Sequence, residues 1–227
     1  MFYWDPTYYM LLPGLILAMI AQAKVQSAYQ RYSRAPSAQG YAGVQVAQAL
    51  LQANGIYDVE VVVGKGQLSD HYDPRHRQVV LSPVVYSSSS VAALAIAAHE
   101  TGHAIQHNES YFPLSIRTML TPGVQVSSAA ALPLFFIGLL MGYYPLTQLG
   151  IYLFTAVVIF QLVTLPVEFN ASRRALIALD SYGFVTEEEY PWARKMLSAA
   201  ALTYVASLAV SLLQLLRLVT LSGRRKK

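Results

Sequence analysis

The segment His99-Glu100-Thr101-Gly102-His103 has the pattern H-E-x-x-H. Residues four apart lie on one face of a helix, so both imidazoles can reach a single zinc ion at about 2.0–2.1 Å. Glu100, next to the first histidine, can hold a zinc-bound water and act as a general base. Polar groups are costly beside the apolar run of residues 91–98 unless they have a partner. We therefore predict a metal site on a helix over residues 90–107.

A third protein ligand is needed, because a catalytic zinc usually takes three and leaves the fourth position to water. His107 continues the four-residue spacing, but at 1.5 Å per residue its Cα lies about 12 Å along the axis from that of His99. Three imidazoles of one straight helix cannot converge on an ion over that distance. We expect His107 to be a helix-end histidine, which the helix dipole favours.

Candidate carboxylates are few, since the chain has 12 Asp and Glu residues. Glu168 stands out because it follows an apolar span, where a carboxylate is expensive without a function or a partner. The alternative for Glu168 is a salt bridge to Arg173 or Arg174. The other acidic residues are predicted to be solvated, either in the first turn of a helix or in loops: Glu187, Glu188 and Glu189 in the turn, Glu109 and Asp180 in loops.

The composition indicates a membrane protein. Of 227 residues, 55% are hydrophobic and only 12% are charged, which excludes a disordered chain and is too apolar for a small soluble globule. The absence of cysteine excludes disulfides, Cys-based zinc fingers and thiol nucleophiles. The net charge of +4 comes from basic clusters beside apolar runs. This placement favours residues that flank membrane spans over a nucleic-acid site, so we expect no nucleic-acid partner.

Apolar stretches divide the chain. They cover about residues 8–23, 124–143, 146–167 and 199–218, and about 20 residues suffice to cross the hydrocarbon core. We predict an N-terminal anchor (1–23), a catalytic region (24–123) and a transmembrane hairpin (124–167). A helix with the third ligand and its following segment (168–198) and an apolar helix with a basic tail (199–227) complete the chain. The fourth stretch has several polar residues and either spans the membrane or packs against the other spans.

The first stretch has an alternative interpretation as a cleaved signal peptide, because Ala21-Gln22-Ala23 has the small-x-small pattern. The residues before it include Asp5 and no Lys or Arg, whereas a signal peptide begins with positive charge. We therefore favour an anchor that is retained.

The polar region has a mixed pattern of helix and strand. We predict a helix over residues 38–53 capped by Ser37, strands over 58–63 and 76–82 with a turn at Asp73-Pro74 before the second, and then the motif helix. The expected fold is a mainly α polytopic membrane protein. It has three or four transmembrane helices and a small α+β zincin-like catalytic region with a short β-sheet.

Several segments together resemble the YugP-type bacterial membrane zinc metallopeptidases. They are His99-Glu100-x-Gly102-His103-Ala104-x-Gln106, Tyr72-Asp73-Pro74, Val167-Glu168-Phe169-x-Ala171-Ser172-Arg173-Arg174-Ala175 and Met1-Phe2-Tyr3-x-Asp5-Pro6-Thr7. The resemblance covers nearly the whole chain and implies a polytopic membrane protein among the neutral zinc peptidases.

The layout is also similar to the HtpX-like gluzincins, in which a membrane hairpin separates the motif helix from a helix with the third-ligand glutamate. That similarity makes Glu168 the third ligand of one zinc ion per chain. HtpX-like proteins have Asp four residues after this glutamate, which orients a zinc-bound histidine. Here that position is Ser172, so Asn170 and Ser172 are both candidates for the contact.

The resulting hypothesis is a membrane-embedded peptidase. Zinc on His99, His103 and Glu168 would activate a water and polarise the scissile carbonyl, with Glu100 as the base. We expect an extended peptide to pair with an exposed edge of the strand over residues 76–82. Candidate oxyanion donors are Tyr72, His71 and Tyr204. The alternatives are a non-enzymatic membrane adaptor with a structural zinc, and a transporter that uses Glu168 as an ion residue.

The distribution of basic residues predicts the orientation in a bacterial cell membrane. With the N-terminus outside, most of the basic residues near span ends face the cytoplasm: Lys24, Arg31, Arg34, Arg117, Arg173, Arg174, Arg194 and Lys195. The catalytic region is then cytoplasmic, and the basic tail is outside if the fourth stretch spans. The expected partners are the lipid bilayer and a membrane-associated peptide or protein substrate, and an oligomer is left open.

Overall fold

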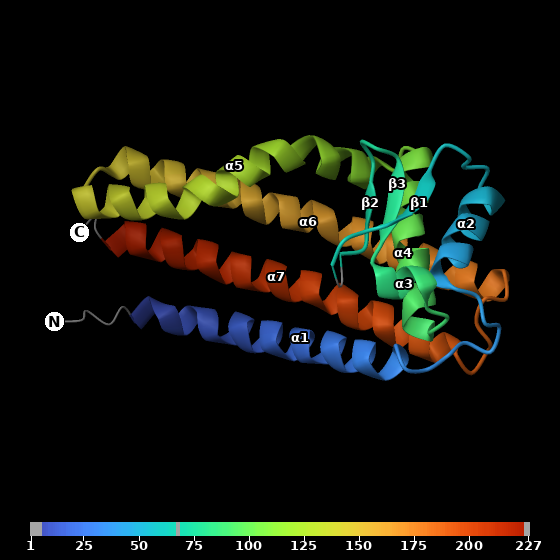
Figure 1. Cartoon of the computed structure of the whole chain (residues 1–227). Helices are drawn as coiled ribbons and strands as arrows, with labels where there is room; N and C mark the ends of the chain where they lie inside the picture. Colours follow the sequence, from blue (N-terminus) through green and yellow to red (C-terminus); the bar gives the residue numbers. More distant parts are fainter. Residues whose placement is uncertain (1–5, 67–68, 225–227) are drawn as a thin grey trace. The chain divides into compact units, whose positions relative to one another are not determined.

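The computed structural model describes residues 6–66 and 69–224, which form seven α-helices, a 3₁₀ helix and a three-stranded sheet (Figure 1). The elements are η1 (Pro6–Leu11), α1 (Leu12–Tyr32), α2 (Gly43–Ala53), β1 (Glu60–Val63), β2 (His71–Asp73), β3 (Gln78–Leu81), α3 (Pro83–Ser87), α4 (Val91–Asn108), α5 (Phe112–Met141), α6 (Tyr144–Ser181) and α7 (Tyr190–Arg224). The predicted fold class is confirmed. The segment before Pro6 and the last three residues of the basic tail lie outside the described residues.

Four helical segments are long and apolar enough to cross a membrane: Pro6–Tyr32, Phe112–Met141, Tyr144–Ser181 and Tyr190–Gly223. The fourth predicted stretch is therefore part of a candidate span. Helix α6, with 38 residues, is about 57 Å long at 1.5 Å per residue, roughly twice the hydrocarbon thickness of about 30 Å. A helix of this length has room both for a span and for residues outside the bilayer.

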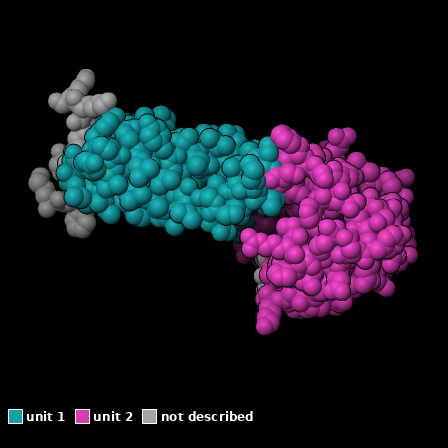
Figure 2. Space-filling view, turned by 90° about the horizontal axis from the view of Figure 1, so that it is seen from above, with its two compact units in different colours: residues 1–22, 116–165, 203–227 teal, residues 23–115, 166–202 magenta. Residues whose placement is uncertain are grey.

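The chain divides into two compact units (Figure 2). Unit 1 comprises residues 1–22, 116–165 and 203–227, and unit 2 comprises residues 23–115 and 166–202. The part of α6 in unit 1, residues 144–165, is about 33 Å long, which matches the hydrocarbon core of a bilayer. Unit 2 contains the sheet, α4 and the part of α6 with Glu168.

Polar side chains of unit 1 form hydrogen bonds inside the unit. Hydroxyls donate to carbonyl oxygens one turn earlier in their own helix: Thr121 to Arg117, Ser127 to Gly123, Thr147 to Tyr143, Thr155 to Ile151 and Thr164 to Phe160. Arg217 is 3% exposed, donates from Nε to Thr7 Oγ1 at 3.0 Å, and places its guanidinium 3.9 Å from the centre of the Tyr8 ring. These bonds lower the cost of polar groups in lipid.

The sheet has the strand order β1-β3-β2, with β3 parallel to β1 and antiparallel to β2. The predicted strands correspond to β1 and β3, whereas β2 was not predicted. The prediction that a substrate pairs with the strand over residues 76–82 is wrong, because β1 and β2 occupy both edges of β3. Strand β2 is only three residues long, too short for an alternating pattern to reveal it.

The start of α7 is held by a buried carboxylate. Glu189, predicted to be solvated, is 5% exposed. It accepts hydrogen bonds from the backbone N–H of Ala38 at 2.7 Å and of Thr186 at 2.9 Å, and from Ser37 Oγ at 3.4 Å. Ser37 therefore does not cap a helix over residues 38–53, and α2 begins only at Gly43. The solvated assignment holds for Glu187 and Glu188, which are exposed.

Two loop predictions for acidic residues have different outcomes. Asp180 is exposed but helical, because α6 continues to Ser181, so its loop assignment is wrong. Glu109 follows the last residue of α4 as its C-cap, outside the helix.

Replacing Glu189 by Gln should destabilise the protein by about 1–3 kcal/mol, because an amide cannot accept all three hydrogen bonds and leaves buried donors unpaired. Glu188→Gln is the matched control and should change the free energy of unfolding by less than about 0.5 kcal/mol, since its side chain is exposed. Equilibrium unfolding in detergent measures both. Equal stabilities of the two variants would contradict the structural role of Glu189.

Candidate metal centre

The motif lies on α4, as predicted. Ser90 caps the helix by accepting a hydrogen bond from the Ala93 N–H at 3.3 Å, and no proline interrupts the 18 residues that follow. Both histidines are therefore on a regular helix, four residues apart on one face. The helix is buried along most of its length, so its polar side chains need partners inside the protein.

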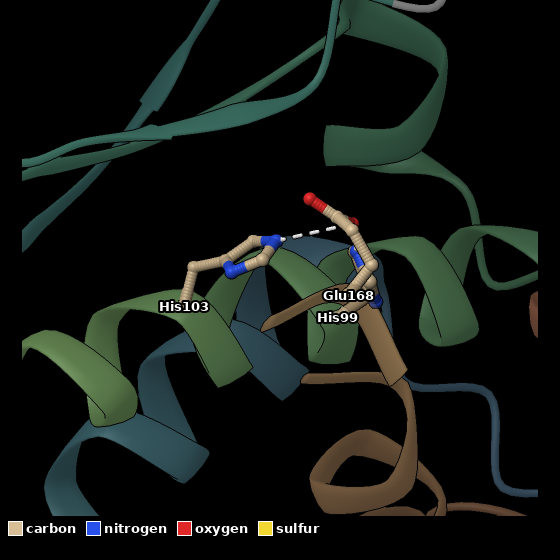
Figure 3. A group of neighbouring side chains, drawn as sticks. All are labelled: His99, His103 and Glu168. Carbon is tan, nitrogen blue, oxygen red and sulfur yellow. Dashed lines mark ion pairs between the residues drawn. The ribbon is translucent and has the colours of Figure 1, made fainter. Parts of the chain in front are cut away.

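Glu168 comes from α6 and meets both histidines (Figure 3). Its Oε2 is 3.3 Å from His99 Nε2 and 3.7 Å from His103 Nε2, and the carboxylate residue is 2% exposed. The ligand atoms of the three residues all lie within 4.8 Å of one another. A tetrahedral ion with bonds of about 2.0–2.1 Å places its ligand atoms about 3.3 Å apart. Two imidazoles and one carboxylate at these separations fit a zinc ion.

The alternative role for Glu168 was a salt bridge to Arg173 or Arg174. Arg174 pairs with Glu109 at 2.6 Å and donates from Nε to Asn170 Oδ1 at 2.7 Å. Arg173 is exposed. Glu168 instead forms ion pairs with the two histidines.

Gly102 allows the two helices to come this close. A Cβ at this position would lie 3.0 Å from the Ala171 carbonyl oxygen and 3.4 Å from the Ala171 Cα. These contacts are with backbone atoms, which cannot rotate away as a side chain can. A side chain at position 102 would therefore push α4 and α6 apart and separate the histidines from Glu168.

Gln106 is a buried residue of the site for which the sequence predicted no role. It is 0% exposed, and its Nε2 donates to the Val167 carbonyl and to Asn170 Oδ1, both at 2.9 Å. Because both Nε2 hydrogens are used, Oε1 is the acceptor for His103 Nδ1 at 3.0 Å. His103 then has its proton on Nδ1 and its Nε2 lone pair free for a metal. The glutamine follows the second motif histidine by three residues, and that spacing is the signal in the sequence.

Ser172 provides the corresponding contact for the other histidine. Its Oγ lies 3.2 Å from His99 Nδ1, and the residue is buried. The sequence left Asn170 and Ser172 as candidates for this role. Ser172 contacts His99 directly, whereas Asn170 is linked to His103 through Gln106.

The electrostatic environment of His103 includes the proposed base. Burial alone would lower the pKa of His103, but the neighbouring carboxylates of Glu168 and Glu100 raise its pKa above the ordinary value. Glu100 is partly buried. Its carboxylate is thus near enough to His103 to raise the pKa of that histidine.

The remaining candidates lie elsewhere. His107 is not in the metal-binding group and instead places Nδ1 2.7 Å from the Tyr72 hydroxyl. His71 is exposed, with its Nδ1 2.7 Å from the Ser69 carbonyl oxygen. Tyr204 belongs to unit 1, whereas the metal-binding group is in unit 2.

The sequence matches a protein family over residues 7–223, and the family is described as "Putative neutral zinc metallopeptidase". The chain belongs to this family. It is 47% identical over 218 residues to the "Putative membrane protease YugP" of Bacillus subtilis (strain 168), a match that covers 95% of this chain and 97% of that protein. No solved structure matches. The resemblance to the YugP-type membrane zinc metallopeptidases is therefore confirmed.

Replacing Gln106 by Met should weaken zinc binding by about 10–100-fold, because His103 loses the acceptor that fixes its tautomer. Thr101→Val is the matched control. Thr101 is equally buried on the same helix, but its hydroxyl donates only to the Ala97 carbonyl, at 2.8 Å, so zinc affinity should stay within about twofold of wild type. Competition against a chelator measures both affinities, and equal affinities would contradict the role of Gln106.

Proposed function

We propose that this protein is a zinc-dependent membrane peptidase that hydrolyses peptide bonds. In this proposal His99, His103 and Glu168 bind one zinc ion per chain. The main support is the number and type of ligands. Within residues 6–66 and 69–224, the group has three members and no fourth His, Cys, Asp or Glu joins it. Three protein ligands and an open position are typical of catalytic zinc, whereas structural zinc usually has four.

Membership of a family described as zinc metallopeptidases supports the same activity. Zinc bound there would polarise the scissile carbonyl and lower the pKa of a coordinated water. Glu100 follows His99 directly on α4, and its carboxylate acts electrostatically on His103. We assign to Glu100 the removal of the water proton and its transfer to the leaving amine.

The side-chain contacts at Nδ1 of the two histidines support the same mechanism. Gln106 accepts from Nδ1 of His103, and Ser172 lies beside Nδ1 of His99. Both histidines therefore direct Nε2 toward the Glu168 carboxylate. A site prepared in this way needs little rearrangement when an ion binds.

The two rival functions have less support. A structural-zinc adaptor needs a fourth ligand, and the described residues supply three. A transporter needs a polar path through the spans. The hydroxyls of Ser127, Thr155 and Thr164 instead bond to carbonyls of their own helices, and Gln148 donates to Ser222 at 3.1 Å. The buried carboxylate faces two imidazoles, which favours a metal ligand over a residue that carries an ion.

We further propose a location in the bacterial cell membrane, with unit 2 in the cytoplasm. Four candidate spans and the name of the Bacillus relative support membrane insertion. The positive-inside rule supports the orientation, because most basic residues near span ends then face the cytoplasm. The expected substrate is a membrane-associated peptide or protein, and no nucleic acid is involved.

Replacing Glu100 by Gln should reduce cleavage of casein or a reporter peptide to background and leave the zinc content near one per chain, because the amide cannot accept the proton. Glu187→Gln is the control, since Glu187 is exposed on the α6–α7 connection, and it should retain full activity. A chelator should abolish wild-type activity, and added zinc should restore it. Full activity of Glu100→Gln would end the case for this mechanism.

The proposed orientation predicts which side of the membrane reacts with an impermeant thiol reagent. The chain has no cysteine, so single substitutions give a clean signal. Gln52→Cys on α2 should react only after the cells are opened, whereas Tyr143→Cys between α5 and α6 should react in intact cells. Both positions are exposed. The reverse pattern would place the catalytic region outside.

A further inference from the structure

The side chains of Tyr72 and His107 form a polar pair that has no role in the mechanism proposed above. The Tyr72 hydroxyl lies 2.7 Å from His107 Nδ1, and the ring centres are 5.7 Å apart. Tyr72 comes from β2, and His107 comes from the last turn of α4, four residues after His103. Both side chains are partly buried.

The helical positions place His107 on the same side of α4 as the base. At about 100° per residue, Glu100 lies about 100° around the helix from His99, and His107 lies about 80° around in the same direction. Gly102 lies about 60° in the opposite direction, and its backbone faces Ala171 of α6. His99 and His103 thus lie between a side that faces α6 and a side that holds Glu100 and His107.

The side with Glu100 and His107 faces the sheet. Ala104, on the far side of Glu100 from His99, packs in one apolar cluster with Val79 and Leu81 of β3, and Tyr72 packs against that cluster. Among the described residues, strand β2 is an edge strand that pairs with β3 alone. The Tyr72–His107 contact therefore links this edge strand to the side of α4 that holds Glu100.

The contact with the Tyr72 hydroxyl involves Nδ1 of His107 and not Nε2. Burial is the main cause that raises the pKa of Tyr72 above its ordinary value, so the phenol keeps its proton at neutral pH. When this hydroxyl donates to Nδ1, the ring proton of His107 is on Nε2, and the proposal below uses this tautomer. His107 therefore has a single N–H donor available.

We propose that His107 is a further catalytic residue, whose Nε2–H donates a hydrogen bond to the carbonyl oxygen of the peptide bond being cleaved, and that Tyr72 is its positioning residue. This proposal rests on the proposed peptidase function. Water oxygen bonds to the carbonyl carbon as Glu100 takes a water proton, and the carbonyl oxygen gains negative charge. The C–N bond then breaks as the proton passes to the amine, and the electron pair on the oxygen re-forms the C=O double bond. A donor at this oxygen stabilises the transition state more than the substrate.

The simpler role for His107 is that of a helix-end histidine favoured by the dipole. Kinetics separate the two roles. A donor to the developing charge affects kcat and leaves KM nearly unchanged, whereas a dipole contact affects only stability.

The test compares His107→Phe, Tyr72→Phe and the double variant in the full-length, zinc-loaded protein. His107→Phe fills a similar volume without a donor, and its kcat should fall about 10²–10³-fold, with KM and zinc content within about twofold of wild type. Tyr72→Phe should lower kcat about tenfold, as when a histidine loses its orienting partner, and should have no further effect in the His107→Phe background. His107→Gln, which retains an N–H donor, should recover part of the loss. His76→Ala is the control, because His76 is an exposed histidine just after β2, and it should keep wild-type kinetics.

The outcomes also separate this proposal from the peptidase function. An active wild type and an inactive Glu100→Gln, with unchanged kcat for His107→Phe, would overturn the role of His107 alone. A rise in KM at constant kcat, or a loss of zinc in parallel with activity, would also overturn it. A fully active Glu100→Gln would instead refute the peptidase mechanism. If His107→Phe does not fold, Tyr72→Phe decides: an unchanged kcat with normal zinc content overturns the proposal.

Discussion

The close approach of α4 to α6 is the contact on which the metal-binding group depends. At Gly102 the backbones come so near that a Cβ would meet the Ala171 carbonyl oxygen at 3.0 Å. One turn later, Gln106 donates to the α6 backbone at Val167 and to Asn170. The small residue permits the contact, and the glutamine specifies its register. Glu168 lies between Val167 and Asn170 on the chain, so the same contact places its carboxylate opposite the two histidines.

The energetics of burial explain why these polar groups occur together. A carboxylate that is 2% exposed is costly unless other groups compensate its charge. Two imidazoles face this carboxylate, and they are in turn held by Gln106 and Ser172. The ligand set contains nitrogen and oxygen but no sulfur, since the chain has no cysteine. Three such ligands favour zinc with an open position.

Different sides of helix α4 hold the packing contacts and the candidate catalytic residues. The side with Gly102 and Gln106 contacts α6, and Ala104 and Ile105 pack in the cluster that includes the sheet. Glu100 and His107 lie on the side toward the sheet, next to the metal ligands.

Local patterns in the sequence were sufficient for the motif helix, the candidate spans and the family, because helical periodicity and apolar length are properties of neighbouring residues. They also suggested Glu168, since a carboxylate beside a span is expensive. The sequence could not separate Glu189 from Glu187 and Glu188, because three adjacent glutamates differ only in what folds against them; one accepts bonds from residues 37 and 38. Nor could it reveal β2 or the order of the strands, since pairing joins distant segments. Tertiary structure alone decided these features and the role of Gln106, because each depends on which parts of the chain meet.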